Sequence, residues 1–185
     1  MSTMQTAPSA VTYMLEPAHS RAHFKVRHMM IANVRGEFSK VSGTVTFDPS
    51  NAAGCKVSAE IDVNSINTHE PDRDNHLKSA DFLDAANFPT IRFQSKKIEA
   101  EGGDSYKVTG DLTIRGATKE VVLRVDDVTP EVKDPWGYLR RGAEATTKIN
   151  RKDFGLTWNQ ALETGGVLVG ETVEITLAME LARQA

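Results

Sequence analysis

The side chains best suited to chemistry gather in residues 69–76, which read His-Glu-Pro-Asp-Arg-Asp-Asn-His. Arg73 carries a planar guanidinium that suits bidentate contact with a phosphate, and His76 follows Asp72 by four positions, the spacing of one helical face. The H-E-x-x-H pattern of zinc proteases is absent because an arginine holds its fifth position. Three roles stay open for the segment: ion pairs that fix it to a strand, contact with a polar group of a ligand, and a metal site. We predict no metal.

His28 is the second candidate. It is in phase with Ala22, Phe24 and Val26, so it is expected to face inward at the end of a strand. There it could donate a hydrogen bond to a polar group of a ligand. It could equally be a core histidine bonded to a backbone carbonyl, and both readings stay open.

Other combinations of reactive side chains give weaker signals. Ser20 stands near His19 and His23, but catalytic triads are defined by geometry and not by proximity in sequence. No G-x-S-x-G, P-loop or dinucleotide-binding pattern occurs, and the single cysteine, Cys55, excludes a disulfide framework. We therefore predict no cofactor, and these combinations give no support for a catalytic site.

The composition narrows the class of protein further. A net charge of −3 over 185 residues offers no overall electrostatic attraction to nucleic acid or to an anionic membrane. No apolar stretch is long enough for a transmembrane anchor. The first residues lack Lys, Arg and an apolar segment, so we expect a cytoplasmic protein, or a periplasmic one if the chain is a processed form. Residues 1–12 are expected to be a flexible tail and residues 13–185 a single domain.

The elements that must position these residues show strict two-residue alternation of apolar and polar side chains, the pattern of antiparallel strands with one apolar face. Eight segments have it: residues 22–28, 43–47, 57–63, 91–93, 106–114, 121–125, 143–149 and 173–181.

The alternation is interrupted twice. Residues 28–34 could form a helical turn, and residues 67–88 are expected to hold two short helices, the first with Pro71 at its start and the second with Ser79 as a plausible N-cap. Eight such strands can close into a barrel or fold as a sandwich, and a barrel can be solid or hold one slender ligand.

Five motifs occur in a fixed order: Glu16–Ser20 (EPAHS), Val34–Phe38 (VRGEF), Arg73–Phe82 (RDNHLKSADF), Gly110–Lys119 (GDLTIRGATK) and Asp153–Leu156 (DFGL). In these motifs, and over nearly the whole chain, the sequence resembles the YceI-like family of lipocalin-like polyisoprenoid-binding proteins. The resemblance implies an all-β fold, an extended eight-stranded antiparallel barrel with short helices near one end.

The resemblance also implies a ligand, a long-chain isoprenoid such as a polyprenyl phosphate or a quinone, inside an apolar tunnel. His28, Arg73 and His76 would then contact its head group. Trp136 and Trp158 are expected to cap or plug the barrel. The tunnel would be lined by inward-facing residues of the strands: Phe24, Val26, Phe47, Ile61, Phe93, Leu112, Ile114, Leu123 and Ile175.

The predicted function is thus non-catalytic binding, storage or transport of such a lipid, with a homodimer compatible with it. Two alternatives stay open. One is an enzyme that acts on a bound lipid or small metabolite through His28, Arg73, Asp74 and His76. The other is a solid barrel that serves as an interaction module.

Overall fold

The computed structural model describes residues 10–184, and residues 1–9 and 185 lie outside that description. Within it, twelve strands form one antiparallel sheet. The only α helix of these residues is α1 (Pro71–Lys78), and η1 (Ala52–Gly54), η2 (Val63–Ser65) and η3 (Arg151–Phe154) are 3-10 turns. The strands are β1 (Val11–Leu15), β2 (Arg21–His28), β3 (Ala32–Phe38), β4 (Val41–Phe47), β5 (Lys56–Asp62), β6 (Ile66–Asn67), β7 (Thr90–Gly102), β8 (Ser105–Ile114), β9 (Ala117–Asp126), β10 (Val132–Lys133), β11 (Leu139–Asn150) and β12 (Val169–Arg183).

These twelve strands build a closed eight-stranded barrel because three of its eight positions are each filled by two consecutive strands, and because β10 pairs with β11 alone and stands outside the closed ring. β1 and β2 together fill one position, and both pair with β12. β4 pairs with β1 and β3 pairs with β2, so β3 and β4 fill the next position. β5 pairs with β4 and β6 pairs with β3, so β5 and β6 fill the third. The sheet then runs through β7, β8, β9 and β11, and the β11–β12 pairing closes it. The predicted fold class is confirmed.

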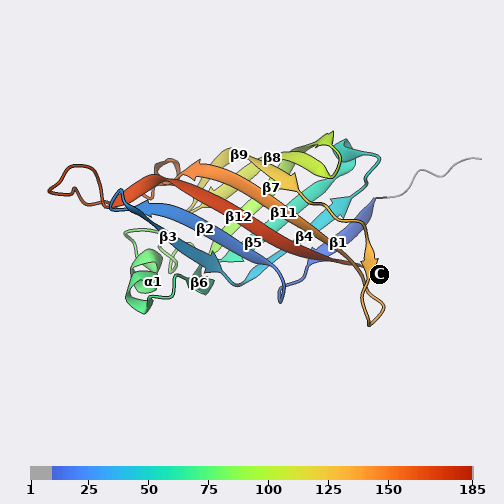
Figure 1. Ribbon diagram of the computed structural model, residues 1–185, viewed down its shortest axis with the longest axis horizontal. Helices are drawn as coiled ribbons and strands as arrows, with labels where there is room; N and C mark the ends of the chain where they lie inside the picture. Colours follow the sequence, from blue (N-terminus) through green and yellow to red (C-terminus); the bar gives the residue numbers. More distant parts are fainter. Residues whose placement is uncertain (1–9, 185) are drawn as a thin grey trace, which may run out of the picture.

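The barrel is long and narrow, with α1 at one end (Figure 1). β12 has 15 residues, which at about 3.3 Å per residue span roughly 50 Å. Each of the eight alternating segments lies in a strand of this sheet, except that Val63 has already entered η2. Their apolar residues point inward and form the core together with residues from the loops around α1.

Two local predictions were wrong. Residues 29–31 form a tight turn between β2 and β3 instead of a helical turn, with the Ile31 N–H donating to the His28 carbonyl. Residues 67–88 hold one α helix and not two. Ser79 is the C-cap of α1, because both its N–H and its hydroxyl donate back to the His76 carbonyl. The Ser79 hydroxyl also accepts from the Asp81 N–H, but the residues that follow form turns and no second helix.

The predicted tail falls mostly on residues outside the description. Val11 and Thr12 nevertheless belong to β1, where they pair with Phe47 and Thr46. The barrel therefore begins two residues earlier than the predicted boundary at residue 13.

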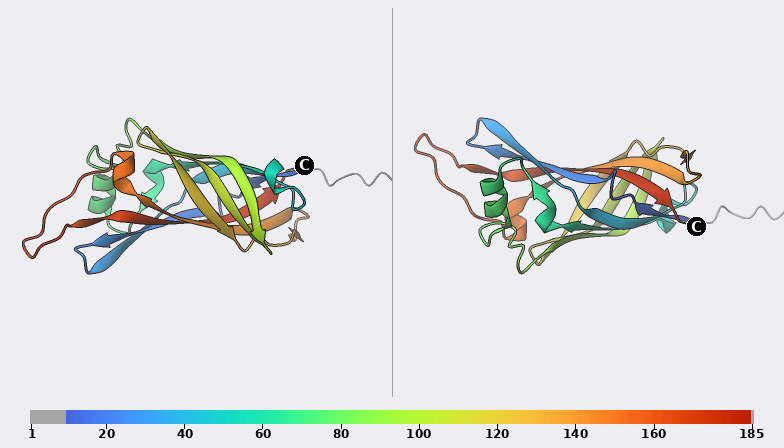
Figure 2. Two further views of the ribbon diagram at one scale, coloured as in Figure 1. Left: turned by 90° about the horizontal axis from the view of Figure 1, so that it is seen from above. Right: turned by 90° about the horizontal axis from the view of Figure 1, so that it is seen from below.

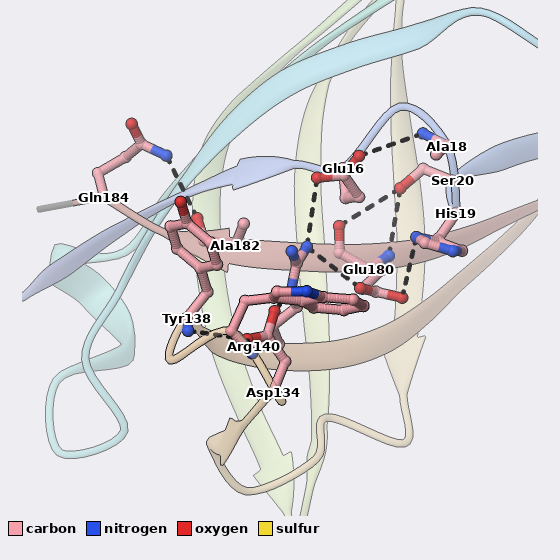
Figure 3. A network of polar contacts seen from close by, with 11 residues as sticks. Glu16, Ala18, His19, Ser20, Asp134, Tyr138, Arg140, Glu180, Ala182 and Gln184 are labelled. Carbon is pink, nitrogen blue, oxygen red and sulfur yellow. Dashed lines mark hydrogen bonds and ion pairs between the residues drawn. The ribbon is translucent and has the colours of Figure 1, made fainter.

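An ion-pair network connects three segments at the end of the barrel opposite α1 (Figure 3). Arg140 on β11 reaches Glu16 and Glu180 at 3.2 Å and donates from Nε to Asp134 at 2.8 Å. The hydrogen bond that Arg140 donates to Asp134 raises the pKa of Arg140, and the network as a whole stabilises its charged form. One side chain thereby joins the bend after β1, the end of β12 and the β10–β11 hairpin.

Candidate ligand cavity

A cavity of about 390 Å³ runs inside the barrel, and its wall is almost wholly apolar. This volume lies in the range of small-molecule binding sites. All nine residues predicted to line a tunnel do line it, and they come from β2, β4, β5, β7, β8, β9 and β12. Small residues of β11, Ala143, Ala145 and Thr147, form part of the wall and leave room inside. The barrel is therefore not solid, and contact of these residues with a ligand stays a prediction.

The cavity opens beside α1. Among the residues that line it, Arg27 at the end of β2 and Arg73 on α1 are exposed to solvent, whereas Cys55 and Tyr106 at the opposite end are buried. In Figure 2, α1, the β2–β3 turn and the loop before β12 all lie at this end. We call it the mouth. The three predicted head-group residues, His28, Arg73 and His76, all line the cavity here.

Arg73 is fixed at the mouth by Thr68, which is 4% exposed, and not by ion pairs with the flanking acids. Its Nε donates to the Thr68 hydroxyl and its Nη2 to the Thr68 carbonyl, both at 2.8 Å. Asp74 accepts from the N–H and hydroxyl of the same threonine and does not line the cavity. Within residues 10–184, Nη1 of Arg73 has no hydrogen-bond partner, so one end of the guanidinium is left to contact a ligand.

His76 belongs to an aromatic cluster at the rim. Its ring packs edge-on against Phe82 and Trp158, with centroids 5.0 and 4.7 Å away, and its Nε2 lies 2.8 Å from Asp81. Trp158 lines the cavity, as its predicted plugging role requires. For Trp136 that prediction was wrong, because this side chain is 80% exposed on the β10–β11 hairpin at the far end and lines no part of the cavity.

His28 is half-buried at the end of β2, opposite Ala32 and Val169. The sequence left two roles open for His28, a donor to a ligand and a core histidine. The second role requires a hydrogen bond from the ring to a backbone carbonyl. Within the described residues its ring makes no hydrogen bond. It therefore has a donor available to the cavity.

Two further arginines line the cavity and were not predicted. Arg151 is 4% exposed and donates to the carbonyls of Leu156, Trp158, Val169 and Gly170 at 2.6–3.2 Å. Desolvation lowers its pKa, and no carboxylate of residues 10–184 lies within ion-pair distance. Its charge is therefore solvated mainly by backbone carbonyls, with Glu171 as a more distant opposite charge. The loop after η3 is thereby tied to the start of β12 at the mouth.

Arg141 closes the opposite end. Its guanidinium carbon lies 5.7 Å from the Tyr13 ring centroid and 5.2 Å from that of Phe47, and Nε donates to the Tyr13 hydroxyl at 2.9 Å. Tyr13 is 1% exposed and donates in turn to Glu131 at 2.7 Å. Both arginines continue the inward phase of Ala143, Ala145, Thr147 and Ile149 by one step in each direction. Extending that alternation would have found them.

The contacts among Arg141, Tyr13 and Glu131 predict that the protein becomes less stable at low pH. The hydrogen bond from Tyr13 holds the pKa of Glu131 below its ordinary value of 4.5, and Arg183 adds to the effect. A carboxyl whose folded pKa is depressed stabilises the fold above its unfolded pKa, and loses that contribution as pH falls through the folded value. Urea unfolding between pH 7 and pH 3 should therefore show a loss of stability below about pH 4.5. The loss should be smaller in Tyr13→Phe, and an equal loss in both proteins would contradict this assignment.

The formally charged side chains that line the cavity are all arginines. Arginine, histidine, cysteine and tyrosine line it, but no aspartate or glutamate among the described residues does. The same residues contain no group of three or more His, Cys, Asp or Glu side chains arranged to hold a metal. They also contain no helix long and apolar enough to cross a membrane.

Comparison with known proteins identifies relatives in sequence and in fold. Protein YceI of Salmonella newport is 40% identical over 142 residues, which are 77% of this chain and 73% of that protein. The crystal structure of BcnA from Burkholderia cenocepacia matches with a TM-score of 0.79 at 26% identity, over 90% of this chain and 98% of that one. A polyisoprenoid binding domain from Saccharophagus degradans, implicated in plant cell wall breakdown, shares the fold at a TM-score of 0.68 and 15% identity, over 94% and 99%.

The YceI-like domain family matches residues 13–181, which is nearly the whole described chain. That span includes α1, every residue discussed at the mouth and all the barrel strands except the first two residues of β1 and the last two of β12. The chain belongs to the YceI-like family.

Proposed function

We propose that this protein binds a long-chain isoprenoid or a similar amphiphilic lipid, without catalysis, for storage or transport. The observation that carries the proposal is the 390 Å³ apolar cavity that runs inside the barrel and opens at one end. A prenyl chain gains about 0.8 kcal/mol for each CH₂ equivalent that leaves water, so the wall needs few polar contacts to hold it. The name of the Saccharophagus domain, which shares the fold, supports the same class of ligand.

The charge of the wall favours an anionic or neutral head group. Arg27, Arg73 and Arg151 lie near the mouth, and no carboxylate of the described residues lines the cavity to attract a cationic group. A phosphate suits the unpartnered end of Arg73, and His28 has a donor for a phosphate or a quinone carbonyl. A polyprenyl phosphate uses both features, whereas a quinone uses only the second.

The geometry supports binding better than catalysis. Of the four residues considered for an enzyme, Asp74 is bound to Thr68 and lies off the cavity wall, while His76 is bound to Asp81. The nearby Ser79 hydroxyl donates to a backbone carbonyl, so it is not paired with the imidazole as a nucleophile would be. Binding a long apolar chain requires none of these residues to react.

Organic extraction of the purified protein, followed by mass spectrometry, tests the proposal together with the native mass of the intact complex. We expect one long-chain isoprenoid or related lipid per chain. A protein that is empty, and that takes up neither polyprenyl phosphate nor quinone when these are added, would overturn the proposal. A native mass twice that of one chain with its lipid would show that the lipid-bound protein is a dimer.

A further inference from the structure

The turn between β2 and β3 presents three consecutive apolar side chains to solvent. Met29, Met30 and Ile31 are 42%, 54% and 75% exposed, and none of them lines the cavity. Single exposed apolar residues are ordinary on protein surfaces, but three in succession at a projecting turn form a local apolar surface. Its removal from water would be favourable. We call residues 29–31 the apolar tip.

The backbone of the tip has a conformation that methionine rarely adopts. Met29 and Met30 have φ values of 51° and 63°, and the Ile31 N–H donates to the His28 carbonyl at 3.1 Å. Positive φ at both central residues is the requirement of a type I′ hairpin turn, which strongly favours Asn-Gly. Two methionines in that conformation are costly, and strain of this kind concentrates at functional segments.

The tip adjoins the mouth of the cavity. Arg27 and His28, the two residues before it, line the cavity. The Met29 N–H donates to the carbonyl of Leu168, another lining residue, at 2.8 Å. The loop of residues 159–168 projects beside the tip at the same end (Figures 1 and 2). The apolar tip therefore lies next to residues that line the mouth.

The hairpin that carries the tip is basic although the whole chain has a net charge of −3. Residues 21–38, which form β2, the tip and β3, contain one acid, Glu37, and four Lys and Arg residues, namely Arg21, Lys25, Arg27 and Arg35. Lys25 is paired with Glu174, whereas Arg27 and Arg35 are exposed and have no ion pair within the described residues. Glu163 on the adjacent loop and Glu70 and Asp72 at the start of α1 are exposed acids of the same end.

We propose that the apolar tip docks on an anionic lipid surface, with residues 29–31 among the acyl chains and Arg27 and Arg35 at the head groups. Apolar side chains flanked by basic ones bind membrane surfaces in this manner. A long apolar ligand then passes between bilayer and cavity without crossing water. That transfer rests on the proposed function, whereas docking does not.

Cosedimentation of the lipid-extracted protein with vesicles tests docking. The vesicles contain phosphatidylcholine and phosphatidylglycerol, with phosphatidylcholine alone for comparison. The tip variant carries Met29→Asn, Met30→Gly and Ile31→Ser, which removes the apolar surface but supplies residues that a type I′ turn prefers, so it should fold. We expect the partition coefficient to fall at least about tenfold. Arg35→Gln and added salt should each weaken binding to the anionic vesicles.

The matched control changes Trp136→Ser and Tyr138→Ser, which are 80% and 60% exposed on the hairpin at the other end. It should bind vesicles as the unaltered protein does. Equal binding by the tip variant, loss of binding in the control, or a tip that mediates only self-association by native mass would each overturn the proposal. Lipid extraction separates the two ideas, because a tip variant that binds no vesicles but still carries lipid after expression preserves the proposed function.

Discussion

Replacing Ala145 with phenylalanine is expected to weaken lipid binding about 200-fold while the barrel still folds. Ala145 is 3% exposed and lies at the middle of β11, opposite Leu177 on β12 and Val125 on β9. Its neighbours on the inner face, Ala143 and Thr147, are also small, so this strip of the wall is where the cavity gains its space. A phenyl ring placed there occupies the path of a bound chain.

The size of the effect follows from the length of chain displaced. If the ring excludes about four CH₂ groups, roughly 3 kcal/mol of burial is lost, which raises Kd about 200-fold. Overfilling an interior costs about 1–3 kcal/mol, but here the ring enters empty space and the cost should lie at the lower limit. Mass spectrometry of extracted lipid and titration with a polyprenyl phosphate measure the loss.

A graded series makes the test independent of any one variant. Ala145→Val, Ala145→Leu and Ala145→Phe should lower affinity in that order, while the midpoints of urea unfolding change little. Glu144→Phe is the matched control, because it places the same ring on the exposed outer face one residue away. Unchanged affinity across the inner series would show that the ligand does not occupy the barrel.

Most strands of the barrel could be predicted from alternation because each has one apolar face. The same alternation also fits a sandwich, and only the resemblance to the family favoured a barrel. β3 was missed for a physical reason. Its inward position between Val34 and Phe38 is Gly36, where a Cβ would lie 2.4 Å from the Phe24 ring. The space of that side chain is filled from the neighbouring strand, so the apolar alternation of β3 is interrupted and the strand is hidden from the sequence.

The cavity could not be predicted from residues alone. Alternation shows which side chains face inward, but the same inward set can fill a barrel or line a void, and only the resemblance to the family favoured the void. The positions of the predicted head-group residues could be predicted, since His28, Arg73 and His76 all line the cavity. The roles of their partners depend on contacts distant in sequence, such as that of His76 with Trp158, which no local pattern contains.

Replacing Arg151 with methionine should cause the largest loss of stability of any single change at the mouth. The variant leaves the carbonyls of Leu156, Trp158, Val169 and Gly170 without the donors that now satisfy them. Each buried acceptor left unsatisfied costs about 1–3 kcal/mol, and partial relaxation toward water reduces the sum. We expect the free energy of unfolding to fall by at least about 3 kcal/mol, measured by urea denaturation.

Two companion variants identify the cause. Lys152→Met removes the neighbouring exposed cation and its 2.6 Å pair with Glu171, and surface pairs contribute at most about 1 kcal/mol, so it should stay near the unaltered protein. Arg151→Lys keeps the charge but not the fork that reaches four carbonyls, and it should recover only part of the loss. Full recovery by lysine would show that charge alone matters. Partial recovery instead assigns Arg151 to holding the loop of Trp158 against β12, and therefore to fixing the mouth through which a lipid enters.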